Sequence, residues 1–283
     1  MKNLSFLRSS PYAKTIYKYC HIFLAADLVL ICLIVYGWYI ACDYNFCTRL
    51  PRRSRTNILA FGDSMTRGFV KRELYYPYSK SLEKTLNRIH SRDTFFVVDN
   101  GGLNGDTAIG HSGDRLQIAL GQKKYDWVIL LFGTNDLYKY LHENKAVPSS
   151  FLDEVFTNLK QLCRIVLQGD RMLVLGTITA RQCEEDAFHE QTCEEFTKSR
   201  EALNKKIRSY VASSTETILL ADFDRHLNYK SLTKVKRQEY WQDNVHFTET
   251  GYEFMAKLVY KKMQPYLPEA VRPNIARNIT LKV

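Results

Sequence analysis

Four short segments of this sequence carry the residue types that nucleophilic acyl transfer requires. Ser64 lies in a Gly-Asp-Ser turn, Gly105 in an Asn-Gly-Asp-Thr turn and Asn135 in a Gly-Thr-Asn-Asp turn. Asp243 and His246 follow near the end of the chain, three residues apart. A serine hydroxyl is a poor nucleophile until an imidazole can take its proton, and a carboxylate must orient that imidazole. The sequence therefore contains the side chains from which an acyl-transfer site could be built.

The Asp-x-x-His spacing occurs twice in the chain, since Asp186 and His189 repeat it. We prefer the pair Asp243 and His246 because it directly precedes the last amphipathic helical pattern, whereas the earlier pair lies in a loop-like stretch after the fourth predicted strand. Because they are three positions apart, the two side chains can lie on one side of a tight turn. A single loop could then deliver both.

Several polar residues beside these segments are better explained by local structure. Asp63 is expected to make a turn or capping hydrogen bond, and Asp136 is expected to anchor its loop through backbone hydrogen bonds. Asn104 and Asp106 are expected to form the turn around Gly105. None of these four is included in the catalytic set.

The segments must be positioned by regular elements, and the hydrophobic pattern predicts which. Five short, continuous apolar runs are typical of strands buried on both faces of a parallel sheet: Asn57–Phe61, Phe95–Asp99, Trp127–Gly133, Met172–Gly176 and Thr217–Asp222. Helical patterns lie between them and after the last, at Ser79–Ile89, Arg115–Gly121, Phe151–Leu167, Glu194–Val211 and Glu249–Tyr266. This alternation predicts an α/β three-layer sandwich, in which functional residues gather beyond the carboxyl ends of the strands.

The four segments together resemble the SGNH hydrolase superfamily, also called GDSL-like esterases and lipases. That superfamily is named after a Ser, a Gly, an Asn and a His in four sequence blocks. Ser64, Gly105, Asn135 and His246 occur in the same order and at similar spacing. The conjunction of four segments, each at a predicted strand end or in the terminal loop, is much more specific than any one of them.

The resemblance covers the chain from Asn57 to about Tyr266 and departs at Met65, where the family has a leucine without a chemical role. It implies a flavodoxin-like sandwich with a parallel five-stranded sheet. It also implies an ester hydrolase that uses no cofactor. The sequence contains no Cys-x-x-Cys pair or His/Cys cluster with zinc spacing, so no metal site is expected.

The resemblance also implies a role for each residue. Ser64 would be the nucleophile, His246 the general base and Asp243 the carboxylate that orients it. The oxyanion hole would consist of the main-chain N–H groups of Ser64 and Gly105 and the side-chain amide of Asn135. The residue types suit this, since glycine lets the backbone approach the substrate closely and the asparagine NH₂ is an uncharged donor.

The implied activity is that of a serine esterase or lipase, which hydrolyses an acyl ester through an acyl-enzyme. The expected partner is a small acyl-ester or lipid substrate. An acyltransferase or a deacetylase acting on a sugar or lipid hydroxyl would use the same residues, because only the exclusion of water separates transfer from hydrolysis. A catalytically silent binding protein of the same fold is less well supported, because the residue set is complete.

The loops after the predicted strands are expected to wall the substrate pocket. They span Arg67–Tyr78, Leu137–Val147, Arg181–Thr192 and Asn228–Gln242. Aromatic residues in these loops offer apolar surface for an acyl or aryl group, or else form small local cores: Phe69, Tyr75, Tyr76, Tyr138, Tyr140, Phe188, Tyr240 and Trp241.

The N-terminal segment His21–Cys42 contains one charged residue, Asp27, and is long enough for a bilayer core of about 30 Å. It lacks a small-x-small cleavage pattern, which favours an uncleaved signal anchor over a signal peptide or a buried helix. The flanking basic residues are nearly balanced, but a short basic tail before a large domain favours a lumenal or extracellular domain. The expected organisation is a basic tail (1–20), a transmembrane anchor (21–42), a linker (43–56), the hydrolase domain (57–267) and a basic C-terminal tail (268–283).

The charge distribution argues against binding to nucleic acid. The net charge is +10, and residues 1–55 contain eight Lys and Arg against two acidic residues, so most of the excess lies outside the predicted domain. Of the seven cysteines, Cys183 and Cys193 flank an acidic, loop-like stretch. They could form a disulfide in an oxidising compartment, or they could be two reduced thiols.

Overall fold

The computed structural model describes residues 19, 28–40, 54–72, 74–90, 94–182 and 191–270. The chain divides into two compact units, Met1–Arg52 and Arg53–Val283. The predicted Asp186/His189 pair, Phe188 and Cys183 lie outside the described residues, as does most of the C-terminal tail.

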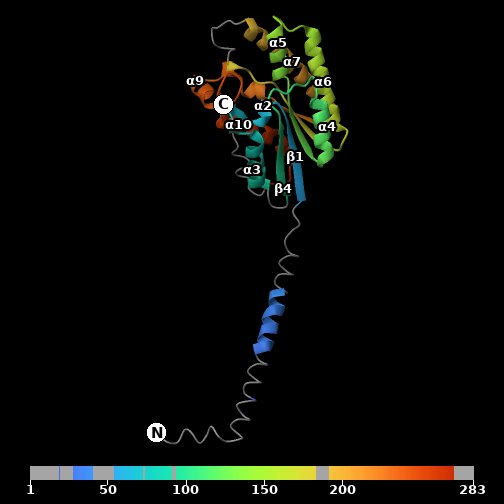
Figure 1. Ribbon diagram of the computed structural model, residues 1–283, viewed down its shortest axis with the longest axis vertical. Coiled ribbons are helices and arrows are strands. Elements are labelled where there is room, and N and C mark those ends of the chain that lie inside the picture. Colours follow the sequence, from blue (N-terminus) through green and yellow to red (C-terminus); the bar gives the residue numbers. More distant parts are fainter. Residues whose placement is uncertain are drawn as a thin grey trace. The chain divides into compact units, whose positions relative to one another are not determined.

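A parallel sheet forms the centre of the second unit (Figure 1). Its strands are β1 (Ser54–Gly62), β4 (Thr94–Gly102), β5 (Trp127–Leu131), β6 (Met172–Gly176) and β7 (Ile218–Ala221). They lie side by side in the order β4-β1-β5-β6-β7. Counting only these strands along the chain, the order is the 2-1-3-4-5 arrangement of flavodoxin-like folds. All five predicted strands, and the parallel five-stranded sheet, are therefore confirmed.

The pleat of β1 explains why the sheet needs a helical layer on each face. Ile58 and Ala60 belong to one buried cluster, whereas Leu59 and Phe61 belong to another. Successive side chains of a strand point to opposite faces, so both faces are apolar and both must be covered.

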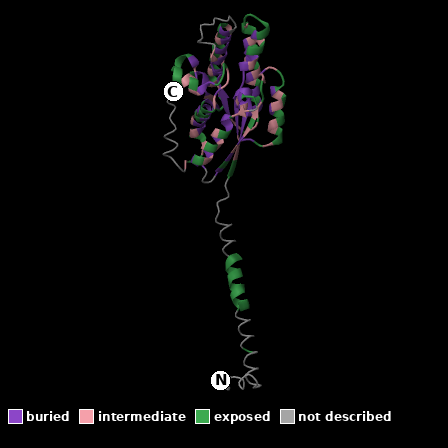
Figure 2. Cartoon of the chain, turned by 60° about the vertical axis from the view of Figure 1, so that its left-hand side comes forward, coloured by how far each residue is buried: buried purple, intermediate pink, exposed green. Residues whose placement is uncertain are grey.

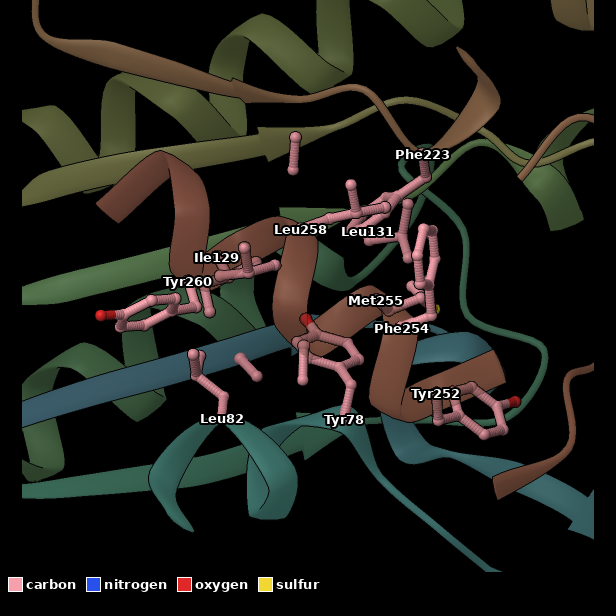
Figure 3. Close-up of a cluster of buried hydrophobic side chains, with 14 of the residues drawn as sticks. Tyr78, Leu82, Ile129, Leu131, Phe223, Tyr252, Phe254, Met255, Leu258 and Tyr260 are labelled. Carbon is pink, nitrogen blue, oxygen red and sulfur yellow. The ribbon is translucent and has the colours of Figure 1, made fainter. Parts of the chain in front are cut away.

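The helices that cover the first face are α3 (Tyr78–His90) and α10 (Glu249–Met263). Figure 3 shows Tyr78 and Leu82 from α3 together with Tyr252, Met255 and Leu258 from α10, packed with the β5 residues Ile129 and Leu131. The second face is covered by α4 (Ser112–Gln122), α5 (Thr134–Glu143), α6 (Ser149–Leu167) and α7 (Gln191–Ser213).

Smaller elements occupy the connections. They are α2 (Ser64–Arg67), the antiparallel pair β2 (Phe69–Lys71) and β3 (Leu74–Tyr75), α8 (Phe223–His226), the 3-10 helix η2 (Tyr229–Ser231), α9 (Lys234–Tyr240) and the 3-10 helix η3 (Gln264–Tyr266). The prediction of a loop over Leu137–Val147 is wrong for most of its length, because α5 continues to Glu143. Leu137 and Leu141 are both buried, and one helical turn between them gives α5 its packed face.

The N-terminal unit is described over residues 28–40, which are helical. All the large apolar side chains of this helix are exposed, as Figure 2 shows. Within the described residues, no helix has both the length and the apolar character needed to cross a membrane. The remainder of the predicted span 21–42 lies outside the described residues, and β1 begins at Ser54, inside the predicted linker 43–56.

Candidate active site

Ser64 is the first residue of α2, immediately beyond the carboxyl end of β1. Asp63 caps this short helix, since its Oδ1 accepts the main-chain N–H of Met65 at 2.9 Å, which confirms the capping expectation. Gly62 is required at the end of the strand, because a Cβ there would collide with Thr66 and with the carbonyl of Leu131. The nucleophile turn is thus held by a capped helix and a close backbone approach.

Asp243 and His246 lie in the loop between α9 and α10. The Asp243 Oδ1 atom accepts the main-chain N–H groups of Val245 and His246, each at 2.7 Å. The main-chain carbonyl of His246 accepts an N–H from Gln242 at 2.9 Å, which closes the turn. This tight turn, expected from the three-residue spacing, puts both side chains on one loop.

The three side chains form a continuous row of hydrogen bonds. The Ser64 Oγ atom lies 2.9 Å from His246 Nε2, across 182 positions of sequence. On the other side of the ring, His246 Nδ1 lies 2.9 Å from Asp243 Oδ2. Both ring nitrogens are therefore engaged, one by the hydroxyl and one by the carboxylate. This is the arrangement in which an imidazole can accept the serine proton while its other nitrogen donates to Asp243.

The electrostatics of Asp243 suit an orienting carboxylate. Partial burial alone would raise its pKa, but hydrogen bonds from His246 and from the N–H of Val245 outweigh this and lower the pKa to about 2. The carboxylate is therefore ionised at neutral pH. An ionised group at this position can stabilise the imidazolium that forms when His246 takes a proton.

Asn135 lies between the nucleophile turn and the loop after β4. Its Nδ2 atom donates to the main-chain oxygen of Asp106 at 3.0 Å and lies 3.5 Å from Asp63 Oδ2. Gly105, which precedes Asp106, has a φ of +74°, and no heavy atom lies within 4 Å of the position a Cβ would take. The space over Gly105 is thus open.

Two buried carboxyl groups support this region. Burial raises the pKa of Asp63 to about 7, although the Met65 N–H and the neighbouring His246 lower it. Burial also raises the pKa of Asp136, whose two oxygens accept the main-chain N–H groups of Ile109 and Ala108 at 2.9 Å each. The prediction that Asp136 anchors a loop is therefore confirmed.

The sequence reasoning missed two side chains beside these residues, Arg115 and Lys139, and it named Phe69 only as a possible part of the pocket wall. The Phe69 ring, from β2, packs on the His246 ring with centroids 4.7 Å apart. Arg115, from α4, donates to Asp106 and to the carbonyls of Gly101 and Gly62. Its guanidinium also lies over the Phe61 ring. No local spacing points to such partners, because each contact joins residues far apart in the chain.

Lys139 is the second missed residue. Its Nζ atom donates to the main-chain oxygen of Gly105 at 2.7 Å. It lies four residues after Asn135 on α5. This spacing places both side chains on one face only if residues 134–143 are helical, which the sequence did not predict.

The expected aromatic lining is partly wrong. Tyr240 and Trp241 are buried in the cluster beneath α10, where Trp241 packs against Phe247 and Tyr240 stacks on Phe254. They form a local core, which was the alternative reading of these residues. Tyr76 and Tyr138 are exposed.

Two hollows of the described surface are lined by other residues than the predicted site residues Ser64, Gly105, Asn135, Asp243 and His246. One of about 260 Å³ lies against α5 and the loop after β4, and is lined by Thr107, Ile109, Asp136, Lys139, Tyr140, Glu143 and Phe151. Another of about 640 Å³ contains none of the predicted site residues and is lined by charged and polar groups around Arg208, Asp222 and Asp224. Within the described ranges, no group of three or more His, Cys, Asp or Glu could hold a metal ion.

Comparison with solved structures shows a shared fold. The chain is similar to Axe2, an acetylxylan esterase from Geobacillus stearothermophilus, with 18% identity, a TM-score of 0.57 and coverage of 75% of this chain and 96% of that one. A lipase/acylhydrolase from Enterococcus faecalis gives 20% identity and a TM-score of 0.56, covering 75% and 97%. A member of the lipolytic protein G-D-S-L family from Veillonella parvula gives 20% identity and a TM-score of 0.54, and the match covers 74% of this chain and 98% of that one.

Comparison with protein families agrees with the resemblance seen in the sequence. No curated protein matches the chain with significant similarity. The model of the GDSL-like Lipase/Acylhydrolase family, however, matches residues 60–254, which run from β1 into α10 and include the Ser64, Asn135 and His246 segments. The chain therefore belongs to the GDSL-like lipase/acylhydrolase family and is a carboxylic ester hydrolase.

Proposed function

We propose that this ester hydrolase acts through an acyl-enzyme formed on Ser64, with His246 as general base and Asp243 as the group that orients it. The observation that carries the proposal is the row of hydrogen bonds from Ser64 Oγ to His246 Nε2 and from His246 Nδ1 to Asp243, both 2.9 Å long. His246 accepts the hydroxyl proton as Oγ attacks the ester carbonyl, and then donates it to the departing alcohol. Water attacks the acyl-enzyme in the second half of the reaction.

The oxyanion of the tetrahedral intermediate would be bound by the N–H groups of Ser64 and Gly105 and by the amide of Asn135. In the part of the chain that the structure describes, no acceptor takes either main-chain N–H, so both are available to a ligand. The Asn135 amide lies beside Asp63 and Asp106, which are the chain neighbours of Ser64 and Gly105. Donors held in place before the reaction stabilise the developing charge without reorganisation.

Hydrolysis and acyl transfer share the acyl-enzyme, so the choice between them must be measured. We expect the full-length protein, given aryl esters of rising acyl length and an acetylated oligosaccharide, to release the free acid even when glycerol or a sugar is present as an acceptor. Mass analysis of the products distinguishes the acid from a transferred ester. If the transferred ester predominates over the free acid, the protein is an acyltransferase and the hydrolytic proposal is wrong.

We further propose that residues 21–42 anchor the enzyme in a membrane, with the hydrolase domain on the lumenal or extracellular side. The exposed apolar side chains of residues 28–40 support an anchor, because such a surface is unfavourable in water. Cys193 is disulfide-bonded, which supports an oxidising compartment. Its pairing with Cys183 remains a prediction.

The membrane proposal predicts that the protein stays in the membrane fraction after alkaline carbonate extraction. A C-terminal tag should be protected from protease in sealed vesicles. Asn278 begins an Asn-x-Thr triplet, the acceptor sequence for N-glycosylation, so Asn278→Gln should remove a glycan shift if the domain is lumenal. A soluble mature protein that starts near Asp43 would instead identify a signal peptide. Digestion of the tag in intact vesicles would place the domain on the cytosolic side.

A further inference from the structure

Helix α5 holds the loop after β4 by several hydrogen bonds. The Asp136 carboxylate accepts the N–H groups of Ala108 and Ile109, each at 2.9 Å. The Asn135 amide donates to the main-chain oxygen of Asp106 at 3.0 Å. These bonds fix the second half of the loop. The Gly105–Asp106 peptide is held on its N–H side by the turn bond from Asp106 to the main-chain oxygen of Leu103 at 3.2 Å, which leaves its carbonyl side to be considered.

Lys139 holds the carbonyl side of this peptide. Its ammonium group donates to the main-chain oxygen of Gly105 at 2.7 Å, and this is the one hydrogen bond to the Gly105 main chain within the described residues. Lys139 lies four residues after Asn135, so both side chains project from the same face of α5 toward the loop. Packing does not hold Gly105, because the space where a Cβ would lie is open.

Gly105 keeps much of its backbone freedom, because nothing packs at its Cβ position and its N–H has no acceptor within the described residues. Glycine adopts positive φ as readily as negative φ, and Gly105 sits at +74°. Rotation about its two backbone bonds would swing its N–H away from the position that an oxyanion donor must occupy. A bond to the carbonyl of the same residue limits that rotation. A charged donor is suited to this, since charge-assisted hydrogen bonds are shorter and stronger than neutral ones.

We infer that Lys139 is a positioning residue: by holding the Gly105 carbonyl, it keeps the Gly105 N–H directed at the oxyanion of the intermediate. The inference rests on the proposed function, since it concerns the same site. Lys139 is exposed, and by its exposure alone it would be classed as a solvated surface lysine. The ammonium acts through the loop, so its loss should weaken binding of the transition state more than binding of the substrate.

The test compares Lys139→Met with Lys139→Arg in the full-length protein. Methionine keeps the apolar stem but cannot donate, and we expect kcat to fall about tenfold with KM nearly unchanged, because a displaced donor is less damaging than an absent one. Arginine can still reach the carbonyl as a charged donor and should restore most of the activity. Asn135→Ala removes a donor outright and should lower kcat by about 10²–10³. The loss in Lys139→Met should be smaller than this.

Inhibition by a boronic acid provides a second readout, because its tetrahedral adduct on Ser64 carries an oxygen in the same hole. Lys139→Met should raise the inhibition constant about tenfold, in step with the fall in kcat. Lys205→Met removes an exposed lysine of α7 and should leave both quantities at the wild-type level. A melting temperature equal to that of the wild type would exclude loss of the fold.

The outcomes separate this inference from the proposed function. If the wild type hydrolyses esters and reacts with a fluorophosphonate at Ser64 but Lys139→Met equals it in kcat and inhibition, the positioning role is wrong and the triad stands. A rise in KM alone, with no change in inhibition, would also overturn it and would mean that Lys139 binds substrate. If the wild type itself does not react at Ser64, the proposed function fails.

Discussion

Replacing Ser64 with alanine is expected to abolish ester hydrolysis, with kcat falling by about six powers of ten. The substitution removes only the hydroxyl group, and the oxygen of that group is the atom that would form the acyl-enzyme. The fold should survive, because the substitution removes one hydrogen bond, to His246, worth about 1 kcal/mol. For a domain of this size such a loss lowers Tm by about 2–4 °C.

Covalent labelling checks the assignment directly. A fluorophosphonate should modify the wild type once and should leave Ser64→Ala unmodified. Ser150→Ala, which alters an exposed serine at the start of α6, should be labelled like the wild type. Persistent labelling of Ser64→Ala at another residue would show that the nucleophile lies elsewhere.

Replacing His246 with alanine is expected to lower kcat by a similar number of powers of ten, since members of a triad act as a unit. The variant loses the proton acceptor for Ser64 and leaves the Asp243 carboxylate without its imidazole partner. The pKa of Asp243 should then rise from about 2, because the His246 side chain is the strongest of the contacts that lower it. Single-turnover hydrolysis of an activated aryl ester measures the loss.

The second Asp-x-x-His pair provides a matched control. His189→Ala removes the same side chain from the same spacing and should change turnover little, unless the loop Arg181–Thr192 shapes the pocket as the sequence predicts. The two variants thus make opposed predictions for two histidines that the spacing alone does not distinguish. Loss of turnover in His189→Ala with an active His246→Ala would show that the catalytic histidine had been taken from the wrong pair.

The sequence by itself determined the strands, the order of the segments and the local turns. Each of the five strands is a continuous apolar run, and such a run has few ways to be buried other than inside a parallel sheet. The caps at Asp63 and the Asp243–His246 turn also depend on residues two or three positions apart. Such interactions are local, so the residue types at those spacings contain the information.

Helix α5 is an element that the local sequence pattern did not predict. The sequence predicts a loop over Leu137–Val147, whereas the structure has a helix over Thr134–Glu143. The buried pair Leu137 and Leu141 stabilises the helix only when the second face of the sheet is there to cover them. Tyr240 and Trp241 likewise became core residues because α10 packs over them, which no spacing within residues 228–242 could reveal.

The partners at the site were decided by the tertiary structure alone. Ser64 and His246 meet across 182 positions, Phe69 packs on the His246 ring, and Lys139 reaches the Gly105 carbonyl. The physical reason is that a parallel sheet brings the carboxyl ends of distant strands to one edge, while the side-chain contacts there depend on the exact placement of helices packed on both faces. Local hydrophobic periodicity predicts the helices and strands, but it does not predict which side chains of different elements come into contact.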